Sequence, residues 1–200
     1  MPAVSLQTLK SMLRVDFDAD DAVLTFYLEA AEAFIERHTR RRLTQAVRTV
    51  RYIWPDTKLR RAVNTVYSAL GWPWPDHMTL PFPPFDSISA VTYTDTDGAT
   101  QTLSSSLYGL DQAGGLTRIL FRGDLPAISV DYPAIAVAFT SGYATGAVPK
   151  DLQLAICRLA GTYYMNPEAV SMLNLVQVPF GVKAVIDNYA VPSFGTEGPE

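Results

Sequence analysis

The stretch DAVLTFYLEAAEAFIERHT, residues 21–39, decides the fold, because it contains no Gly or Pro and its apolar residues recur with helical spacing. Two apolar stripes run side by side along the expected helix. They consist of Val23, Tyr27, Ala30 and Phe34, and of Leu24, Leu28, Ala31 and Ile35. A helix that is apolar over most of its circumference is either buried in a large domain or packed on two sides. Because this chain has few helices, we expect the second arrangement, with the first stripe facing a neighbouring subunit.

Capping signals predict where the helices begin. The long helix is expected over about residues 18–39, with Asp18 as its cap and further acidic residues in its first turn, where backbone N–H groups lack partners. A short helix over about 5–13 is expected to begin at Ser5. A third helix over about 149–165 begins at Pro149, a residue that suits a first helical position.

The middle of the chain, about residues 45–141, alternates like β-strands and is predicted to be an inserted antiparallel β-domain. Asp97-Gly98 is typical of a hairpin turn within it. After the third helix we expect a C-terminal arm over about 166–200, in which 181–190 adds one or two helical turns before a flexible polar tail. The predicted class is α+β: a single domain, residues 1–200, with a small helical bundle and the inserted sheet.

A Pro-rich and aromatic segment, VYSALGWPWPDHMTLPFPPF, occupies residues 66–85. Each Pro lacks an N–H donor and restricts the residue before it, so we expect a protruding loop without regular structure. Its rings either cover an open face of the sheet or anchor a partner, because rigid aromatic side chains bury area at little entropic cost. Trp72 and Trp74 are the candidate partner contacts.

Composition excludes several classes of function. A net charge of −4 and a pI near 5.2 argue against tight wrapping of nucleic acid, which depends on Lys and Arg neutralising phosphates. Cys157 is the only cysteine, so an intramolecular disulfide is excluded. There is no signal peptide and no apolar run near the roughly 18 residues that span a bilayer, so we expect a soluble, unexported protein without membrane contact.

No motif predicts catalysis, a metal or a cofactor, and we expect none of these sites. The only histidines, His38 and His77, lie in no HExxH spacing. Asp76-His77 is half of a hydrolase relay without a GxSxG nucleophile turn. With the two tryptophans, this pair leaves a hydrolase or carbohydrate-binding protein as a rival hypothesis. Four clustered aspartates lack the glycine and closing glutamate of a calcium loop. They are Asp16, Asp18, Asp20 and Asp21.

One charge feature stands out, because nine of the sixteen Lys and Arg residues fall between positions 37 and 61. They are Arg37, Arg40, Arg41, Arg42, Arg48, Arg51, Lys58, Arg60 and Arg61. Three interpretations stay open: a solvated surface, a docking site for an acidic protein, and direct contact with DNA. Arg40, Arg41 and Arg42 are candidate partner contacts, and the stretch 37–61 supports the alternative function of a DNA-binding packaging factor.

Three stretches, taken in order, resemble the head-tail connector proteins, or adaptors, of long-tailed bacteriophages and gene transfer agents. LKSMLRVDFDADDAVLTFYLEAAEAFIERHTRRRL, residues 9–43, resembles their short helix, acidic turn and long helix. LPFPPFDSISAVTYTDTDGATQTL, residues 80–103, resembles their sheet. VAFTSGYATGAVPKDLQLAICRLAGTYYMNPEA, residues 137–169, resembles their strand, Gly-Tyr turn and returning helix.

This resemblance implies a structural, non-catalytic virion protein that assembles as a ring, commonly of twelve, between the portal and a tail-side neck or stopper protein. The ring extends the DNA channel in the particle neck, after assembly in the bacterial host cytoplasm, and DNA only passes through it. The family's C-terminal segment orders on docking to the portal, which makes Tyr189 and Phe194 expected partner contacts. The segment 71–77, GWPWPDH, departs from the shorter family pattern.

Overall fold

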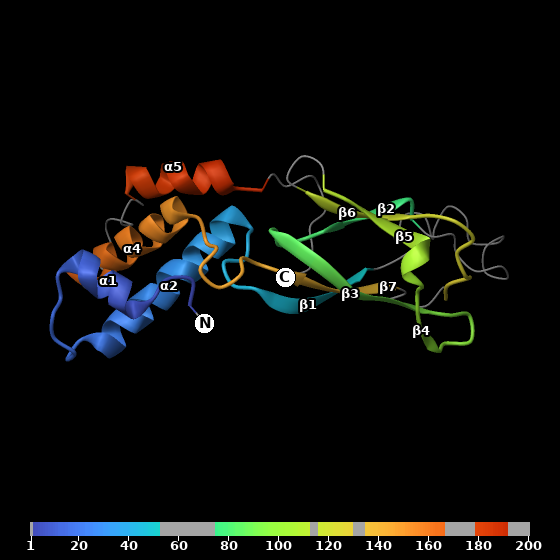
Figure 1. Ribbon diagram of the computed structural model, residues 1–200, viewed down its shortest axis with the longest axis horizontal. Coiled ribbons are helices and arrows are strands. Elements are labelled where there is room, and N and C mark those ends of the chain that lie inside the picture. The colour runs from blue at the N-terminus through green and yellow to red at the C-terminus, as the bar shows by residue number, and fades with distance from the viewer. Residues whose placement is uncertain (1, 53–74, 113–115, 130–134, 167–178, 192–200) are drawn as a thin grey trace, which may run out of the picture. The chain divides into compact units, whose positions relative to one another are not determined.

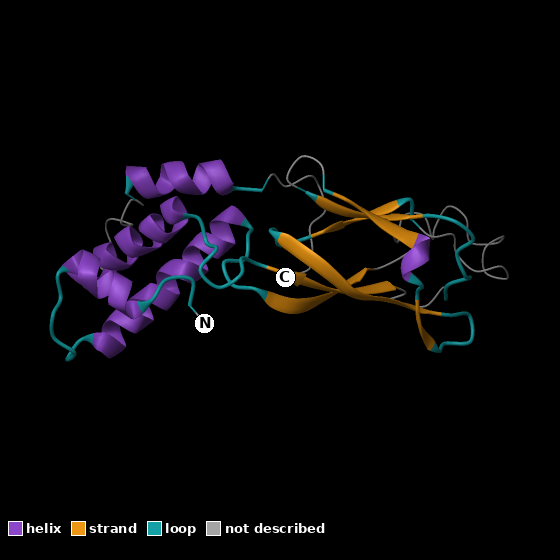
Figure 2. Ribbon diagram, viewed as in Figure 1, coloured by secondary structure: helices purple, strands orange, loops and turns teal. Residues whose placement is uncertain are grey.

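The computed structural model describes residues 2–52, 75–112, 116–129, 135–166 and 179–191. The chain divides into two compact units. The helical unit comprises Met1–Gln45 with Gly142–Glu200, and the β unit comprises Ala46–Ser141. Figure 1 and Figure 2 show helices in the first unit and strands in the second. The chain leaves the helical unit once and returns once, and its class is α+β, as predicted.

The helical unit contains four described helices, placed where the apolar periodicity predicts helix. They are α1 (Leu6–Leu13), α2 (Asp21–Thr39), α4 (Lys150–Met165) and α5 (Phe180–Tyr189). Ser5 caps α1, since its Oγ accepts the Thr8 N–H at 3.2 Å. Helix α5 is longer than the one or two turns expected from the sequence and packs beside α4 (Figure 1).

The start of α2 corrects the predicted cap. The helix begins at Asp21, with Asp20 at the N-cap position and no side-chain capping bond. Asp18 instead accepts a hydrogen bond from Lys10 Nζ at 2.6 Å, and Asp21 accepts another at 2.7 Å. The Lys10 ammonium group is nearly buried. It forms a stronger hydrogen bond to a carboxylate than a backbone N–H does, because hydrogen bonds between ions are stronger than those to neutral groups.

The core of the helical unit forms where α2 packs against α4. Leu24, Leu28, Ala31 and Ile35 of α2 are buried there, together with apolar residues of α1, α4 and α5. Gly161 of α4 lies against α1: a Cβ there would lie 2.9 Å from Leu13 Cδ2, so the Leu13 side chain would have to shift.

The β unit consists of two antiparallel sheets that share one core. The four-stranded sheet has the order β1-β7-β3-β4, and the three-stranded sheet has the order β2-β6-β5. The strands are β1 (Ala46–Tyr52), β2 (His77–Leu80), β3 (Phe85–Thr94), β4 (Thr100–Thr102), β5 (Tyr108–Asp111), β6 (Thr117–Phe121) and β7 (Ile135–Ser141), with a 3-10 turn at Ser105–Leu107. The predicted hairpin joins β3 to β4, where Gly98 has a φ of +82°.

Strand β2 corrects the prediction that residues 66–85 lack regular structure. Within that segment, His77–Leu80 pairs with β6, and Met78 and Leu80 point into the core. The strand forms because its apolar residues alternate and the prolines at 75 and 81 flank it without interrupting its N–H donors. The rest of the described segment has no further strand before β3.

Candidate assembly surfaces

Helix α2 has one face in the core and another that is only partly covered. Of the four predicted interface residues, Val23 is 45% exposed, whereas Tyr27, Ala30 and Phe34 are half-buried. Tyr27 lies against Tyr163 of α4, with ring centroids 6.2 Å apart. The predicted stripe is therefore in part covered by the subunit itself.

The most exposed aromatic residue of this helix is not among the four predicted interface residues. Phe26 is 66% exposed, and its ring lies 6.0 Å from that of Tyr27. Its position three residues after Val23 is the signal that could have identified it, since such residues are neighbours on a helix surface. We use "outward α2 face" for Val23, Phe26, Tyr27 and Ala30.

Further apolar side chains are exposed near the start of α2. Phe17 precedes the helix and is exposed, as is Met165 at the end of α4. The Tyr164 hydroxyl donates to Asp20 Oδ2 at 2.6 Å, which ties the end of α4 to the turn before α2. The outward α2 face thus lies at an end of the helical unit where other large apolar residues meet water.

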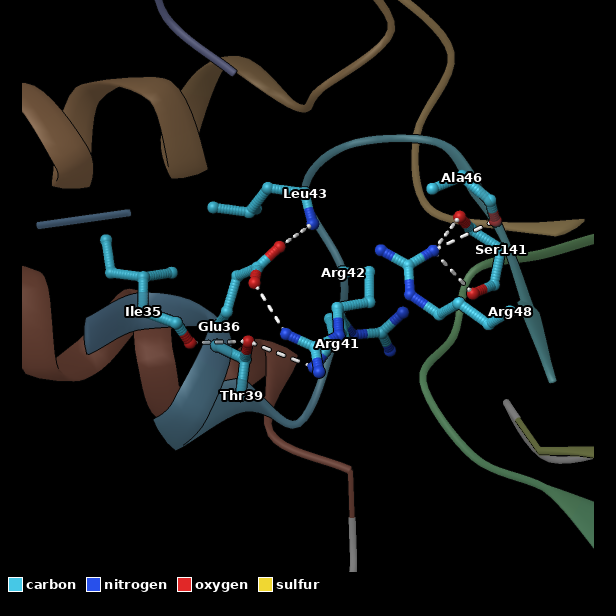
Figure 3. A network of polar contacts seen from close by, with 9 residues as sticks. All are labelled: Ile35, Glu36, Thr39, Arg41, Arg42, Leu43, Ala46, Arg48 and Ser141. Carbon is cyan, nitrogen blue, oxygen red and sulfur yellow. Dashed lines mark hydrogen bonds and ion pairs between the residues drawn. The ribbon is translucent and has the colours of Figure 1, made fainter. Parts of the chain in front are cut away.

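The turn after α2 contains the three arginines predicted as partner contacts. Two of them bind groups of the same subunit. Arg42 Nη1 contacts Glu36 Oε2 at 2.8 Å, while Glu36 Oε1 accepts the Leu43 N–H at 2.7 Å (Figure 3). Arg41 Nε donates to the Tyr189 carbonyl at 2.7 Å. Arg40 is exposed and has the left-handed conformation that ends the helix. Of the three, only Arg40 points its charge mainly to water.

Hydrogen bonds connect the end of α5 to the turn that follows α2. Thr39 is buried, its hydroxyl donates to the Ile35 carbonyl at 2.7 Å, and its own carbonyl accepts the Val191 N–H at 3.0 Å. The Tyr189 hydroxyl donates to Asp151 Oδ1 at 3.0 Å. Partial burial, and then this hydrogen bond, raise the pKa of Tyr189. Tyr189, a predicted partner contact, is therefore bound within its own subunit.

Of the other basic residues between positions 37 and 61, one is bound within the protein, two are exposed, and three lie outside the described residues. Arg48 Nη1 donates to the Ser141 carbonyl at 2.7 Å and to the Ala46 carbonyl at 3.0 Å (Figure 3). Arg37 and Arg51 are exposed. Lys58, Arg60 and Arg61 lie outside the described residues, as do the predicted contacts Trp72, Trp74 and Phe194. The described part of the stretch 37–61 therefore does not form one uniform cationic surface.

The candidate chemical residues form no reaction centre in the described part of the chain. Asp76 and His77 are exposed at the start of β2. Cys157 is buried, and burial raises the pKa of its thiol, which lowers the reactive thiolate population. Among the described residues no group of His, Cys, Asp or Glu could hold a metal ion. The same residues include no helix long and apolar enough to cross a membrane.

Comparisons with known proteins show what this chain is similar to in sequence and in fold. Residues 3–70 match the family model of phage gp6-like head-tail connector proteins. No curated protein matches the chain. A chain in the neck of an empty gene transfer agent particle, computed with C6 symmetry, is 25% identical, with a TM-score of 0.71 over 98% of this chain and 94% of the other.

Two other solved structures give similar values. A chain in the virion of a native gene transfer agent particle is 27% identical, with a TM-score of 0.70 over 97% of this chain and 93% of that one. A chain in the neck of a native particle, computed with C12 symmetry, is 25% identical, with a TM-score of 0.65 over 99% and 97%. The predicted resemblance is confirmed: this chain is similar to head-tail connector proteins in sequence over residues 3–70, and to chains of gene transfer agent necks over nearly its whole length.

Proposed function

We propose that this chain is a non-catalytic connector subunit that forms a ring below the portal of a phage or gene transfer agent and extends the DNA channel toward the tail. The supporting observation is the match to neck chains over 98% of this chain and 94% of one such chain. Because those necks are computed with C6 and C12 symmetry, a ring of sister copies, with twelve as the proposed number, is the assembly that we expect.

The outward α2 face is the proposed contact between sister copies. Val23 and Phe26 are large apolar residues on one helix, and a contact with another molecule would remove their exposed area from water. Burial stabilises a contact by about 25 cal/mol per Å² of apolar surface. A ring repeats one heterologous contact around its circumference, so a single patch of this kind acts in every subunit.

Contacts with the portal and with a tail-side stopper protein are proposed for other residues. Arg40 is exposed at the end of α2 and offers a cation to an acidic partner surface. The segment from residue 192, which includes Phe194, and the pair Trp72 and Trp74 complete the proposed partner contacts. The protein would act in the particle neck after assembly in the host cytoplasm.

The charge distribution favours passage of DNA over retention. The chain has a net charge of −4, and the contacts of Arg41, Arg42 and Arg48 hold these side chains to the protein itself. A packaging factor that bound duplex through residues 37–61 would lose affinity steeply with salt, because it would release counterions. Retention of the purified protein on duplex DNA at low salt would support that alternative over the connector.

Cryo-electron microscopy of particle necks tests the proposal directly. We expect this chain in a closed ring that contacts the portal, and mass measurement of the purified chain with portal should show several copies bound. A position outside such a ring would overturn it. The catalytic form of the hydrolase or carbohydrate-binding rival is tested by His77→Ala, because unchanged activity in this variant would eliminate it.

A further inference from the structure

A ring contact joins two different surfaces, because the contact between successive copies in a ring is heterologous. The outward α2 face supplies one of these surfaces under the proposed connector function, on which this inference rests. The second surface lies elsewhere on the next copy, and its chemistry must complement the first.

The turn before α2 extends the outward α2 face with an aromatic ring beside a carboxylate. Phe17 is 53% exposed, and Asp16 next to it is exposed and forms no ion pair among the described residues. The turn is held on both sides of these two residues. Val15 is buried before them, and Asp18 after them accepts a hydrogen bond from Lys10 Nζ at 2.6 Å. Because the turn is ordered in the free subunit, little conformational entropy is lost when a partner binds it.

The C-terminal half of α2 has the complementary chemistry. The rings of Phe34 and His38 are stacked, with centroids 3.9 Å apart, and they are half-buried and exposed, respectively. Arg37 is exposed and lies three residues after Phe34, so the two are neighbours on the helix surface. No acidic side chain of the described residues forms an ion pair with Arg37. Aromatic rings beside a guanidinium group suit a partner that offers an aromatic ring beside a carboxylate.

The local net charge changes sign from one end of α2 to the other. Residues 10–21 contain four aspartates against two cations, whereas residues 36–42 contain four arginines against one glutamate. The helix rises about 24 Å from Asp21 to Arg37, so Asp16 and Arg37 lie near opposite ends of α2 and cannot pair within one subunit (Figure 1). Two sister copies placed head to tail bring these opposite charges together, which steers association and fixes its register.

We infer that Asp16 and Phe17 of one copy dock on Arg37 and the stacked Phe34 and His38 rings of the next copy. Phe17 packs against the stacked rings, which removes apolar area of both copies from water, and the Asp16 carboxylate pairs with the Arg37 guanidinium group. Each copy then uses one end of α2 toward each of its two neighbours, so the same contact repeats until the ring closes.

A charge exchange in the full chain tests this pairing. At about 50 mM salt, we expect Asp16→Arg and Arg37→Asp each to lower the fraction of chains in rings with portal at least about tenfold, because each change places like charges opposite one another. The double variant D16R/R37D carries the same two charges in exchanged positions. Its ring fraction should return to within about twofold of that of the parent, as measured by native mass.

Two matched controls and one apolar variant make the result specific to this contact. D124R and R158D make the same charge changes at exposed residues outside the proposed pair, and both should form rings like the parent. Phe17→Ser should weaken ring formation without loss of folding. The urea midpoints of D16R, R37D and the double variant should match that of the parent, because both residues are exposed.

The outcomes separate this inference from the proposed function. Parental ring fractions from D16R and R37D would overturn the pairing while the connector function stands. A double variant that assembles no better than the single variants would also overturn it, and would assign these charges to contacts with other proteins such as the portal. A parent chain that never forms rings with portal would refute the connector function itself.

Discussion

Helix α2 has two apolar faces, one buried in the core of the subunit and one partly exposed to water. Leu24, Leu28, Ala31 and Ile35 are buried against α4 and its neighbours, whereas Val23 and Phe26 are 45% and 66% exposed. Both faces look alike in the sequence, yet one stabilises the subunit and the other is proposed to join subunits. The difference shows that apolar periodicity identifies surfaces that need covering, and that the packing of the fold decides which of them remain uncovered.

Adjacent alanines give the largest expected contrast between the faces. Ala31 is fully buried, so Ala31→Asp should lower the free energy of unfolding by about 4 kcal/mol or more, because a carboxylate would be buried without a partner. Ala30 is half-buried, and Ala30→Asp should cost far less while hindering ring assembly. Urea denaturation of both variants measures this. Equal destabilisation would mean that the two faces are not distinct in the free subunit.

A truncation of the inward face should have the next largest effect. Leu28 is 2% exposed, and Leu28→Ala should destabilise the chain by about 2–5 kcal/mol through lost burial and a residual cavity. Phe26→Ala is the matched control and should change stability by about 0.5 kcal/mol or less. The comparison fails if Phe26→Ala costs as much as Leu28→Ala in chemical denaturation.

Substitutions on the outward α2 face should weaken assembly more than they affect folding. We expect V23S/F26S to fold normally but to weaken ring formation with portal at least about tenfold, which corresponds to about 1.4 kcal/mol. L110S/L120S, which changes two similarly exposed residues of the β unit, should assemble like the parent. Light scattering and native mass measurement report the assembled fraction. Unaltered rings from V23S/F26S would remove this face from the interface.

The smallest effect concerns Glu32, which lies on α2 and accepts the Val4 N–H at 3.1 Å. Burial, and then the carboxylates Glu36 and Glu29, raise its pKa above the ordinary 4.5. Its contribution to stability is therefore fully present below about pH 4.5 and is lost as the pH rises through the raised value. Since Gln has an oxygen that can still accept this bond, Glu32→Gln should stabilise the chain at about pH 7 by no more than about 1 kcal/mol.

The pH dependence of this gain is the check. Urea midpoints of Glu32→Gln and of the parent should differ at about pH 7 and converge near pH 4, where the carboxyl group is protonated in both folded and unfolded chains. A variant that is less stable than the parent at neutral pH would show that the charged carboxylate holds the N-terminal segment better than a neutral acceptor does.

Local patterns in the sequence determined the elements of this protein and its class. The 3.6-residue spacing in 21–39, the Ser5 cap, Pro149 before α4 and the Asp97-Gly98 hairpin each depend on residues a few positions apart. Such patterns reflect backbone geometry, which nearby residues control. The resemblance to connector proteins was also readable, because it rests on the order of these elements.

Only the tertiary structure decided which of these residues meet. Asp18 pairs with Lys10 instead of capping α2, β2 forms within a Pro-rich segment, and Arg41 contacts Tyr189, which is 148 positions away. Each of these outcomes depends on a partner that local spacing does not reveal. The same reason explains why Leu28 belongs to the core and Phe26 to the surface: burial is a property of the packed helices and not of one helix alone.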